Sequence, residues 1–257
     1  MSTGRSLEVF KRIYIGGYDL SAYFSDSGEQ GTEYEEHPTA NFADAIQGVL
    51  AGKPTLKCGP FTGVFDNTAT SGLHVLADAA KGTRRNVMVA QGVRAAPAMG
   101  DDVFCAPVYQ MGYKTVGAGI VTARLEFSGA DAAGSMLYDN FWGKLIHAHE
   151  SAGAANSANT NVDNGAESTA GGYLMYQIQS IAGGAGTVTL SIDDSANGTD
   201  WLALDGATTG AIAYSAAPTS GIVQLAVGAT VRQYLRWQYA ESGATSAVFS
   251  LAFVRGR

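Results

Sequence analysis

YLMYQIQSIAGGAGTVTLSI, residues 173–192, is the stretch of sequence that decides the fold. Its two ends, 173–181 and 186–192, are rich in β-branched and aromatic residues, and a glycine-rich turn separates them. Further β-type runs follow along the chain at 200–204, 210–215, 221–227, 231–239 and 246–254. Seven short strands separated by Gly, Asn and Asp turns predict a β-sandwich in the second half of the chain.

A long polar segment precedes these strands. Residues 150–171, ESAGAANSANTNVDNGAESTAG, contain almost no large apolar side chain, which is typical of a linker or a long loop. The sequence therefore predicts three parts. They are a first unit at 1–149, the linker or loop at 150–171, and a β-sandwich half or domain at 172–257.

The first half also contains strand signals. Residues 12–24 predict two short strands joined by a tight turn at a Gly-Gly pair, and further β-type runs cover 54–65, 86–91, 104–110 and 112–127. In the last run Val121, Ala123, Leu125 and Phe127 alternate with Thr122, Arg124 and Glu126, which predicts one buried and one polar face. The acidic segment 25–40 predicts a loop or a long exposed hairpin, with Glu33, Glu35 and Glu36 on a solvated face.

Two short segments have helical spacing. Asn41 is a candidate cap for a helix that carries Phe42, Ala45, Ile46, Val49 and Leu50 and stops at Gly52. A second helix is predicted over 70–82, capped by Thr70 or Ser71, with Leu73, Leu76, Ala77 and Ala80 on one face and Gly82 at its end. The predicted fold class is therefore mainly β, with one or two short helices.

Composition and charge exclude several classes of protein. Of the 257 residues 46% are hydrophobic, so a packed core is expected, and only 15% are charged. The net charge is -7, and the only dense basic pair is Arg84-Arg85, which argues against affinity for nucleic acid. Residues 1–15 carry no export signal and no stretch is long and apolar enough to span a membrane, so we expect a soluble protein made in the cytosol.

Two groups of residues are candidate metal ligands. His147 and His149 lie two apart, on one face of a strand, with Glu150 next to them, but a zinc site needs a further ligand that no motif supplies. Residues 193–200, DDSANGTD, place Asp193, Ser195 and Asn197 like the start of a calcium loop, yet Leu204 stands where that loop needs Glu. We therefore expect polar strand residues at the first place and a strand-connecting turn at the second.

No arrangement of residues predicts an enzyme. The sequence has no Gly-x-Ser-x-Gly nucleophile motif, and Gly117-Ala118-Gly119 is not followed by the Lys-Ser/Thr of a phosphate-binding loop. Cys58 and Cys105 have no neighbouring His, and we expect two buried small side chains there, although a single disulfide between them stays open. No catalytic residue, cofactor or metal is predicted.

The order of segments carries a family resemblance. Its motifs are Asp19-Leu20-Ser21, Phe42-Ala43-Asp44, Leu50-Ala51-Gly52-Lys53, Gly63-Val64-Phe65-Asp66, the helix at 72–81, TVTLSIDDSANGTDWLAL at 187–204 and VRQYLRW at 231–237. Together they resemble the major tail proteins, or tail-tube proteins, of siphovirus-type bacteriophages. In the 187–204 hairpin this chain departs from the pattern, because Ala196-Asn197-Gly198 replaces the usual Asp-Gly.

This resemblance implies a virion structural protein with a tail-tube-type β-sandwich or barrel core. Its subunits would form hexameric rings that stack into a tail tube assembled in the host cytoplasm, with the tape measure protein and the tail terminator and initiator proteins as partners. DNA would pass through the lumen without specific binding, because an acidic wall repels phosphates. Glu126 and the Asp and Glu residues of 26–36 are the candidate lumen side chains.

A second hypothesis stays open. The chain could be a carbohydrate- or receptor-binding β-sandwich protein of a phage tail, with Trp201, Trp237 and Tyr239 stacking on sugars. The same aromatic residues could equally be buried in the core of the sandwich.

Overall fold

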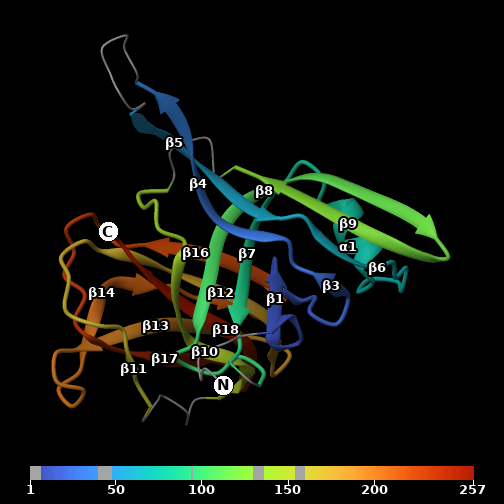
Figure 1. The fold of residues 1–257 in the computed structure, drawn as a ribbon. Coiled ribbons are helices and arrows are strands. Elements are labelled where there is room, and N and C mark those ends of the chain that lie inside the picture. Colours follow the sequence, from blue (N-terminus) through green and yellow to red (C-terminus); the bar gives the residue numbers. More distant parts are fainter. Residues whose placement is uncertain (1–6, 40–47, 94, 130–135, 154–159) are drawn as a thin grey trace.

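The computed structural model describes residues 7–39, 48–93, 95–129, 136–153 and 160–257, and these form mainly antiparallel strands (Figure 1). The largest sheet has eight strands along its main path, in the order β16-β12-β18-β10-β8-β7-β1-β2. Their bounds are β16 Thr219–Gln224, β12 Gly172–Ala182, β18 Ser246–Arg255, β10 Trp142–Ala152, β8 Asp102–Ala118, β7 Arg84–Gln91, β1 Lys11–Ile15 and β2 Tyr18–Asp19. The expected mainly-β fold is thus confirmed.

This sheet curves until its two ends touch. The backbone N–H of Gly17, in the turn between β1 and β2, donates to Oε1 of Gln177 on β12 at 2.7 Å. Nε2 of Gln177 donates in turn to the carbonyl oxygen of Asn86 on β7 at 2.9 Å, and Asn86 donates to Ser220 on β16 at 3.1 Å. Side-chain hydrogen bonds therefore join the two ends where no strand pairing is described.

The space inside the curve is filled by alternate residues of its strands. Met88 and Ala90 of β7 point inward, whereas their neighbours Val87 and Val89 belong to a separate cluster outside. The inner cluster also contains Tyr14, Val103, Cys105, Leu145, Tyr173, Met175, Ala252 and Val254. The buried hydroxyl of Tyr173 donates to the carbonyl oxygen of Cys105 at 2.8 Å, which satisfies its polar group. The curved sheet is therefore a packed barrel-like body.

A second sheet covers the outer side of β12, β18 and β10. Its order is β11-β17-β13-β14, with β15 also paired to β13. The bounds are β11 Val162–Asp163, β17 Tyr234–Ser242, β13 Thr187–Ser195, β14 Leu202–Thr208 and β15 Ile212–Ala213. Leu174, Leu190, Leu235 and Phe253 are among the residues of the core between the two sheets. All seven strands predicted over 173–254 are present, and the predicted β-sandwich is confirmed.

The other outer side, over β1, β7 and β8, is covered by α1 (Leu73–Ala79), β6 (Phe61–Val64) and β9 (Ile120–Ser128). Leu73 and Ala77 of α1 are buried, and Gln110 of β8 donates to the carbonyl oxygen of Ala77 at 2.6 Å. The helix predicted over 70–82 is confirmed. Its predicted cap is wrong, because Gly72 is the N-cap residue and no side chain caps the helix.

The helix predicted from Asn41 to Gly52 is not confirmed. Residues 40–47 lie outside the described part of the chain, and its described end belongs to strand β5 (Val49–Gly59). There Val49 and Leu50 pair with Pro38 and His37 of β4 (Glu29–Pro38). Backbone pairing with β4 therefore overrides the helical spacing of the apolar side chains. Within the acidic segment 25–40, β4 forms one half of a long hairpin with β5, whereas the preceding strand β3 (Phe24–Asp26) pairs with β6.

The run predicted as one strand over 112–127 is instead a hairpin. It turns at Gly119, whose φ of 91° is readily available only to glycine, and β8 then pairs with β9 from Ala118↔Ile120 to Tyr109↔Ser128. The alternation predicted for β9 holds at its centre, where Ala123 and Leu125 are buried and Arg124 is exposed, but it fails at Val121, which is exposed. The turn was missed because Gly117 and Gly119 lie within a continuous β-type composition.

The predicted division at 150–171 stays a prediction. Strand β10 extends to Ala152 and pairs along its length with β18 at the end of the chain. It also pairs with β8 through Trp142↔Phe104. Strands from both sides of the predicted linker therefore belong to one hydrogen-bonded sheet.

We predict that Gln177→Ala lowers the free energy of unfolding by about 2 to 4 kcal/mol, because it leaves the buried Gly17 N–H without a partner and opens a cavity. Urea unfolding followed by circular dichroism measures this loss. Gln179→Ala is the matched control, since Gln179 is an exposed residue of the same strand, and it should change stability by no more than about 0.5 kcal/mol. Equal effects of the two substitutions would contradict the role of Gln177.

Candidate assembly surfaces and the predicted site residues

The distal part of the β4–β5 hairpin has no core of its own. We call residues 32–38 and 49–55 the β4–β5 ribbon; every one of them is exposed except Gly52, which is half-buried. Figure 1 shows the ribbon extending away from the rest of the molecule. Closer to the body, Leu56 and Cys58 are buried and anchor the hairpin. A two-stranded ribbon with both faces in water is marginally stable at best.

The edges of this ribbon are also open. Within the described ranges β4 and β5 pair only with each other, in a two-stranded sheet separate from the other two sheets. The outward N–H and C=O groups of both strands therefore offer sites for pairing with another chain. The ribbon carries the exposed apolar side chains of Tyr34, Val49 and Leu50, and Glu33 forms an ion pair with Lys57 at 2.9 Å. It thus combines open backbone edges with apolar contact area.

A second hairpin, β8–β9, carries exposed apolar residues near its turn. Val64 of β6 and Val116 of β8 both pair with Thr122 of β9, so they share one face of the sheet, and Ile120 lies on the same face. The exposed fractions of these three side chains are 50%, 56% and 70%. The sequence showed the alternation of β9 but not this apolar face, because Val64 and Val116 come from other strands.

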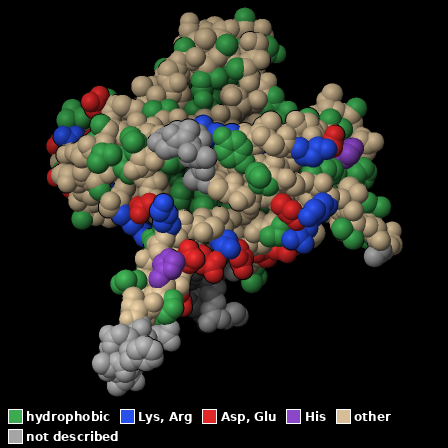
Figure 2. Space-filling view, turned by 90° about the horizontal axis from the view of Figure 1, so that it is seen from above, with side chains coloured by type: hydrophobic (Ala, Val, Ile, Leu, Met, Phe, Trp, Pro, Cys, Tyr) green, Lys and Arg blue, Asp and Glu red, His purple; other side chains and the backbone are tan. Residues whose placement is uncertain are grey.

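The same face of β8–β9 bears a group of charges next to the apolar residues. Glu126 accepts hydrogen bonds from Nζ of Lys114 at 3.0 and 3.1 Å, and Nε of Arg124 lies 3.4 Å from its carboxylate. Two cations thus flank the one carboxylate, so Glu126 is a weak source of negative potential for a lumen. The face seen in Figure 2 has Lys and Arg scattered among Asp and Glu, without one large basic patch.

The two histidines predicted as candidate metal ligands do not face each other. The pairing of β10 with β18 shifts between His147 and Glu150, and this irregularity changes the direction of the side chains. His147 is buried between the two sheets, stacked on Phe249 at 4.0 Å and edge-on to Trp237 at 4.5 Å. His149 stacks instead on Tyr14 and hydrogen-bonds Ser250, on the other face. The expectation that both face one side was wrong.

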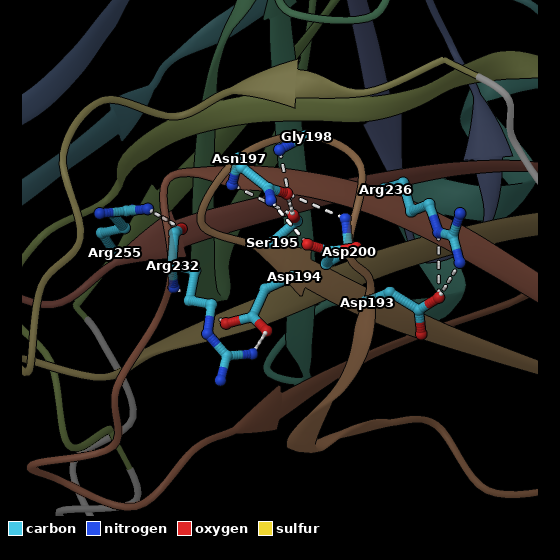
Figure 3. A network of polar contacts seen from close by, with 9 residues as sticks. All are labelled: Asp193, Asp194, Ser195, Asn197, Gly198, Asp200, Arg232, Arg236 and Arg255. Atoms are coloured by element: carbon cyan, nitrogen blue, oxygen red, sulfur yellow. Dashed lines mark hydrogen bonds and ion pairs between the residues drawn. The ribbon is translucent and has the colours of Figure 1, made fainter.

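The candidate calcium loop is a turn between β13 and β14, as expected (Figure 3). Asp193 accepts hydrogen bonds from Nε and Nη2 of Arg236 at 3.0 and 2.8 Å, and the buried Asp194 is paired with Arg232 at 2.9 Å. Oδ1 of Asn197 accepts from the backbone N–H groups of residues 199 and 200. These oxygens are therefore already occupied by hydrogen bonds and ion pairs within the chain.

The aromatic candidates for sugar stacking separate into two kinds. Trp237 and Tyr239 lie in the core of the sandwich, each with 6% of its surface exposed, so neither ring face is available. Burial and the neighbouring Glu241 raise the pKa of Tyr239 to about 12. Trp201 is half-buried immediately before β14, with the guanidinium of Arg236 4.5 Å from its ring centroid.

Both cysteines are free and buried, and they lie in different clusters. Burial raises the pKa of each thiol above its usual range. In the described part of the chain no group of three or more His, Cys, Asp or Glu side chains is placed to hold a metal ion. The helical segments that the structure describes include none with the length and apolar character needed to cross a membrane.

No protein-family model matches the chain, and no curated protein matches it. Among solved structures it is similar to the Dit protein (gp 19.1) of phage SPP1, from a hub adsorption apparatus of phages that infect Gram-positive bacteria. That match has 14% identity and a TM-score of 0.35, and covers 95% of this chain and 99% of that chain. A chain of the phage p2 baseplate in its activated conformation matches with 9% identity and a TM-score of 0.30, covering 96% and 98%. The mosquito-larvicidal Cry4Aa toxin of Bacillus thuringiensis matches with 11% identity and a TM-score of 0.18, covering 100% and 54%.

We predict that His147 makes stability fall in weak acid. Burial lowers its pKa from 6.5 to about 4, so the unfolded chain binds more protons than the folded chain between these two values. Stability is therefore retained above about pH 6.5 and lost as the pH falls toward 4. Between pH 7 and pH 5 the loss from this group is roughly 2 kcal/mol.

Urea midpoints of the wild type and of His147→Gln at the two pH values measure this loss. The variant should be less stable at neutral pH but should show a smaller fall on acidification, because Gln does not titrate. The carboxylates common to both proteins cancel in the difference. Parallel pH profiles for the two proteins would show that His147 is not the responsible group.

Proposed function

We propose that the chain is a structural subunit of a bacteriophage tail, and within the tail the tube subunit that stacks as hexameric rings into a conduit for viral DNA. The observation that carries the proposal is the β4–β5 ribbon, which has two exposed faces and two open edges on an otherwise well-packed body. The order of tail-protein motifs from Asp19 to Trp237 supports it and indicates the kind of assembly. We propose no enzymatic activity.

The physical properties of the ribbon favour its making contacts between subunits. A ribbon that contributes no core to its own subunit gains stability when its apolar side chains and open edges are covered by another copy. Contact of this ribbon with a different surface of the next copy is heterologous, and such contacts generate rings when they close and filaments when they do not. Contact between the ribbon of one copy and a different surface of the next copy is therefore enough to build rings and tubes of this chain.

The charge of the chain agrees with a conduit. A net charge of -7 disfavours tight binding of duplex DNA, since binding relies on neutralising phosphates. The proposed partners are further copies of this chain, the tape measure protein and the tail terminator and initiator proteins. The proposed location is the virion tail, assembled in the host cytoplasm.

We predict that removal of most of the ribbon abolishes assembly and leaves the body folded. Replacing residues 35–53 by Asn-Gly connects Tyr34 to Pro54, which already pair, through a turn of two residues that suits a hairpin. Negative-stain microscopy should show rings or tubes for the wild type, alone or with the tail initiator, and none for the shortened protein. Circular dichroism and thermal unfolding should be close to the wild type, because the described residues among those removed are exposed, apart from the half-buried Gly52.

A shortened protein that still forms tubes would contradict the role of the ribbon. A wild type that stays monomeric with the initiator and chaperone present would contradict the proposed function itself.

We predict also that Ile120→Asp on the β8–β9 hairpin impairs assembly, because a charge there opposes burial of the apolar face. Val227→Asp is the matched control, since Val227 is likewise 70% exposed and lies in a loop after β16. Size-exclusion chromatography and microscopy compare the two. Equal behaviour of the two variants would show that the β8–β9 face is not a contact surface.

The position of the protein in the phage particle tests whether the chain forms the tail tube. Gold-labelled antibody should mark the tail along its whole length if the chain forms the tube. Label confined to one end would contradict the tube assignment and would support a structural role elsewhere in the tail.

A further inference from the structure

A shallow cleft of about 520 Å³ lies beside the turn between β13 and β14. No residue of the β4–β5 or β8–β9 hairpin lines it. Residues 196, 197 and 199–202 line it together with Arg232. The turn is held rigid from within. Ser195 and Asn197 accept hydrogen bonds from four backbone N–H groups of residues 197–200, at 2.9 to 3.3 Å. The cleft is therefore preformed by a turn that needs no ligand to stay in place.

Trp201 is among the residues that line this cleft. The guanidinium of Arg236 covers the ring at 4.5 Å, and Arg236 is itself held by Asp193, but Arg236 does not line the cleft. The cation–π contact thus helps to fix the position of the ring. A fixed aromatic ring at the wall of an open cleft is a stacking surface whose conformational entropy is already lost.

The polar groups of the cleft suit hydroxyl groups. Asp200 is exposed and uses one oxygen to accept from Asn197 at 2.7 Å, which leaves acceptor capacity on its carboxylate. Arg232 donates Nη1 to Asp194 at 2.9 Å, and its side chain is 33% exposed, so further N–H donors remain beside the cleft. An acceptor and a donor therefore flank one aromatic ring.

The charges near the cleft select against anions. Arg232 and Arg236 are each neutralised by an aspartate on β13, and the carboxylate of Asp200 adds a negative charge. A negatively charged ligand would be repelled, whereas a neutral ligand would not. The ligand that fits has an apolar ring face for Trp201 and a hydroxyl edge for Asp200 and Arg232.

We infer that this cleft binds a neutral saccharide, with the C–H face of a hexopyranose ring on Trp201 and its hydroxyls on Asp200 and Arg232. The inference does not depend on the proposed tail function, because the ribbon and the β8–β9 face take no part in it. An open cleft with one stacking ring predicts a weak site, with a Kd on the order of 1 mM.

Saturation-transfer difference NMR on the full chain tests this inference, with methyl β-glucoside, methyl β-galactoside and N-acetylglucosamine as probes. At least one probe should give a saturable signal. Trp201→Ala should weaken it about tenfold or more, which corresponds to about 1.4 kcal/mol of binding free energy. Trp142→Ala is the matched control, because Trp142 is 38% exposed on β10 and does not line this cleft, and it should bind like the wild type.

A second pair of variants keeps the test valid if Trp201→Ala does not fold. Asp200→Ala should also weaken binding, whereas Asp205→Ala removes the same charge from an exposed position on β14 outside the cleft and should not. Absence of a saturable signal for all three probes overturns the inference. Binding that survives both Trp201→Ala and Asp200→Ala overturns it as well, because the site then lies elsewhere.

Discussion

The structure depends on closure of one curved sheet by a buried amide. Gln177 on β12 bonds the turn after β1 and the backbone of β7, so it joins strands that are 160 and 91 residues away in the chain. A primary amide can do this because it donates and accepts at the same time. The bond to Gly17 is buried and the bond to Asn86 is partly buried. An unmatched polar group is costly in such surroundings, so the two bonds favour this closed arrangement over a more open one.

Closure determines where the remaining elements can pack. Once the sheet surrounds its inner cluster, its outer surface needs cover on two sides. The second sheet covers β10, β12 and β18, and α1 with β6 and β9 covers β1, β7 and β8. The β4–β5 ribbon extends beyond these covers, so its described residues pack against no core within the subunit. The proposed assembly role of the ribbon is thus a consequence of how the body closes.

The polar residues that look chemical in the sequence mostly stabilise the fold. His147 is a neutral aromatic-like side chain between the sheets, and Asp193 and Asp194 bind arginines of β17 and the segment before it. Their spacing in the sequence resembled that of metal ligands. In the structure, however, a β-bulge turns His147 into the core, and Asp193 and Asp194 each form an ion pair with an arginine. The candidate site was predicted only in part. The exposed acidic hairpin was among the expectations for 25–40. The start of its second strand, residues 49–52, was expected to end a helix, and the apolar face of β8–β9 was not foreseen.

Sequence alone determined the strands of the second half, the helix at 73–79 and the buried positions at the centre of β9, because apolar periodicity and turn residues are local signals. Only the tertiary structure decided which strands pair. Strand pairing placed Val49 and Leu50 in a strand and turned His147 and His149 in opposite directions. The fold also brought Arg236 onto the ring of Trp201. Each of these depends on residues far apart in the chain. The free energy of strand pairing and burial depends on partners brought together only by the complete fold, and it exceeds the small local preference of any one segment.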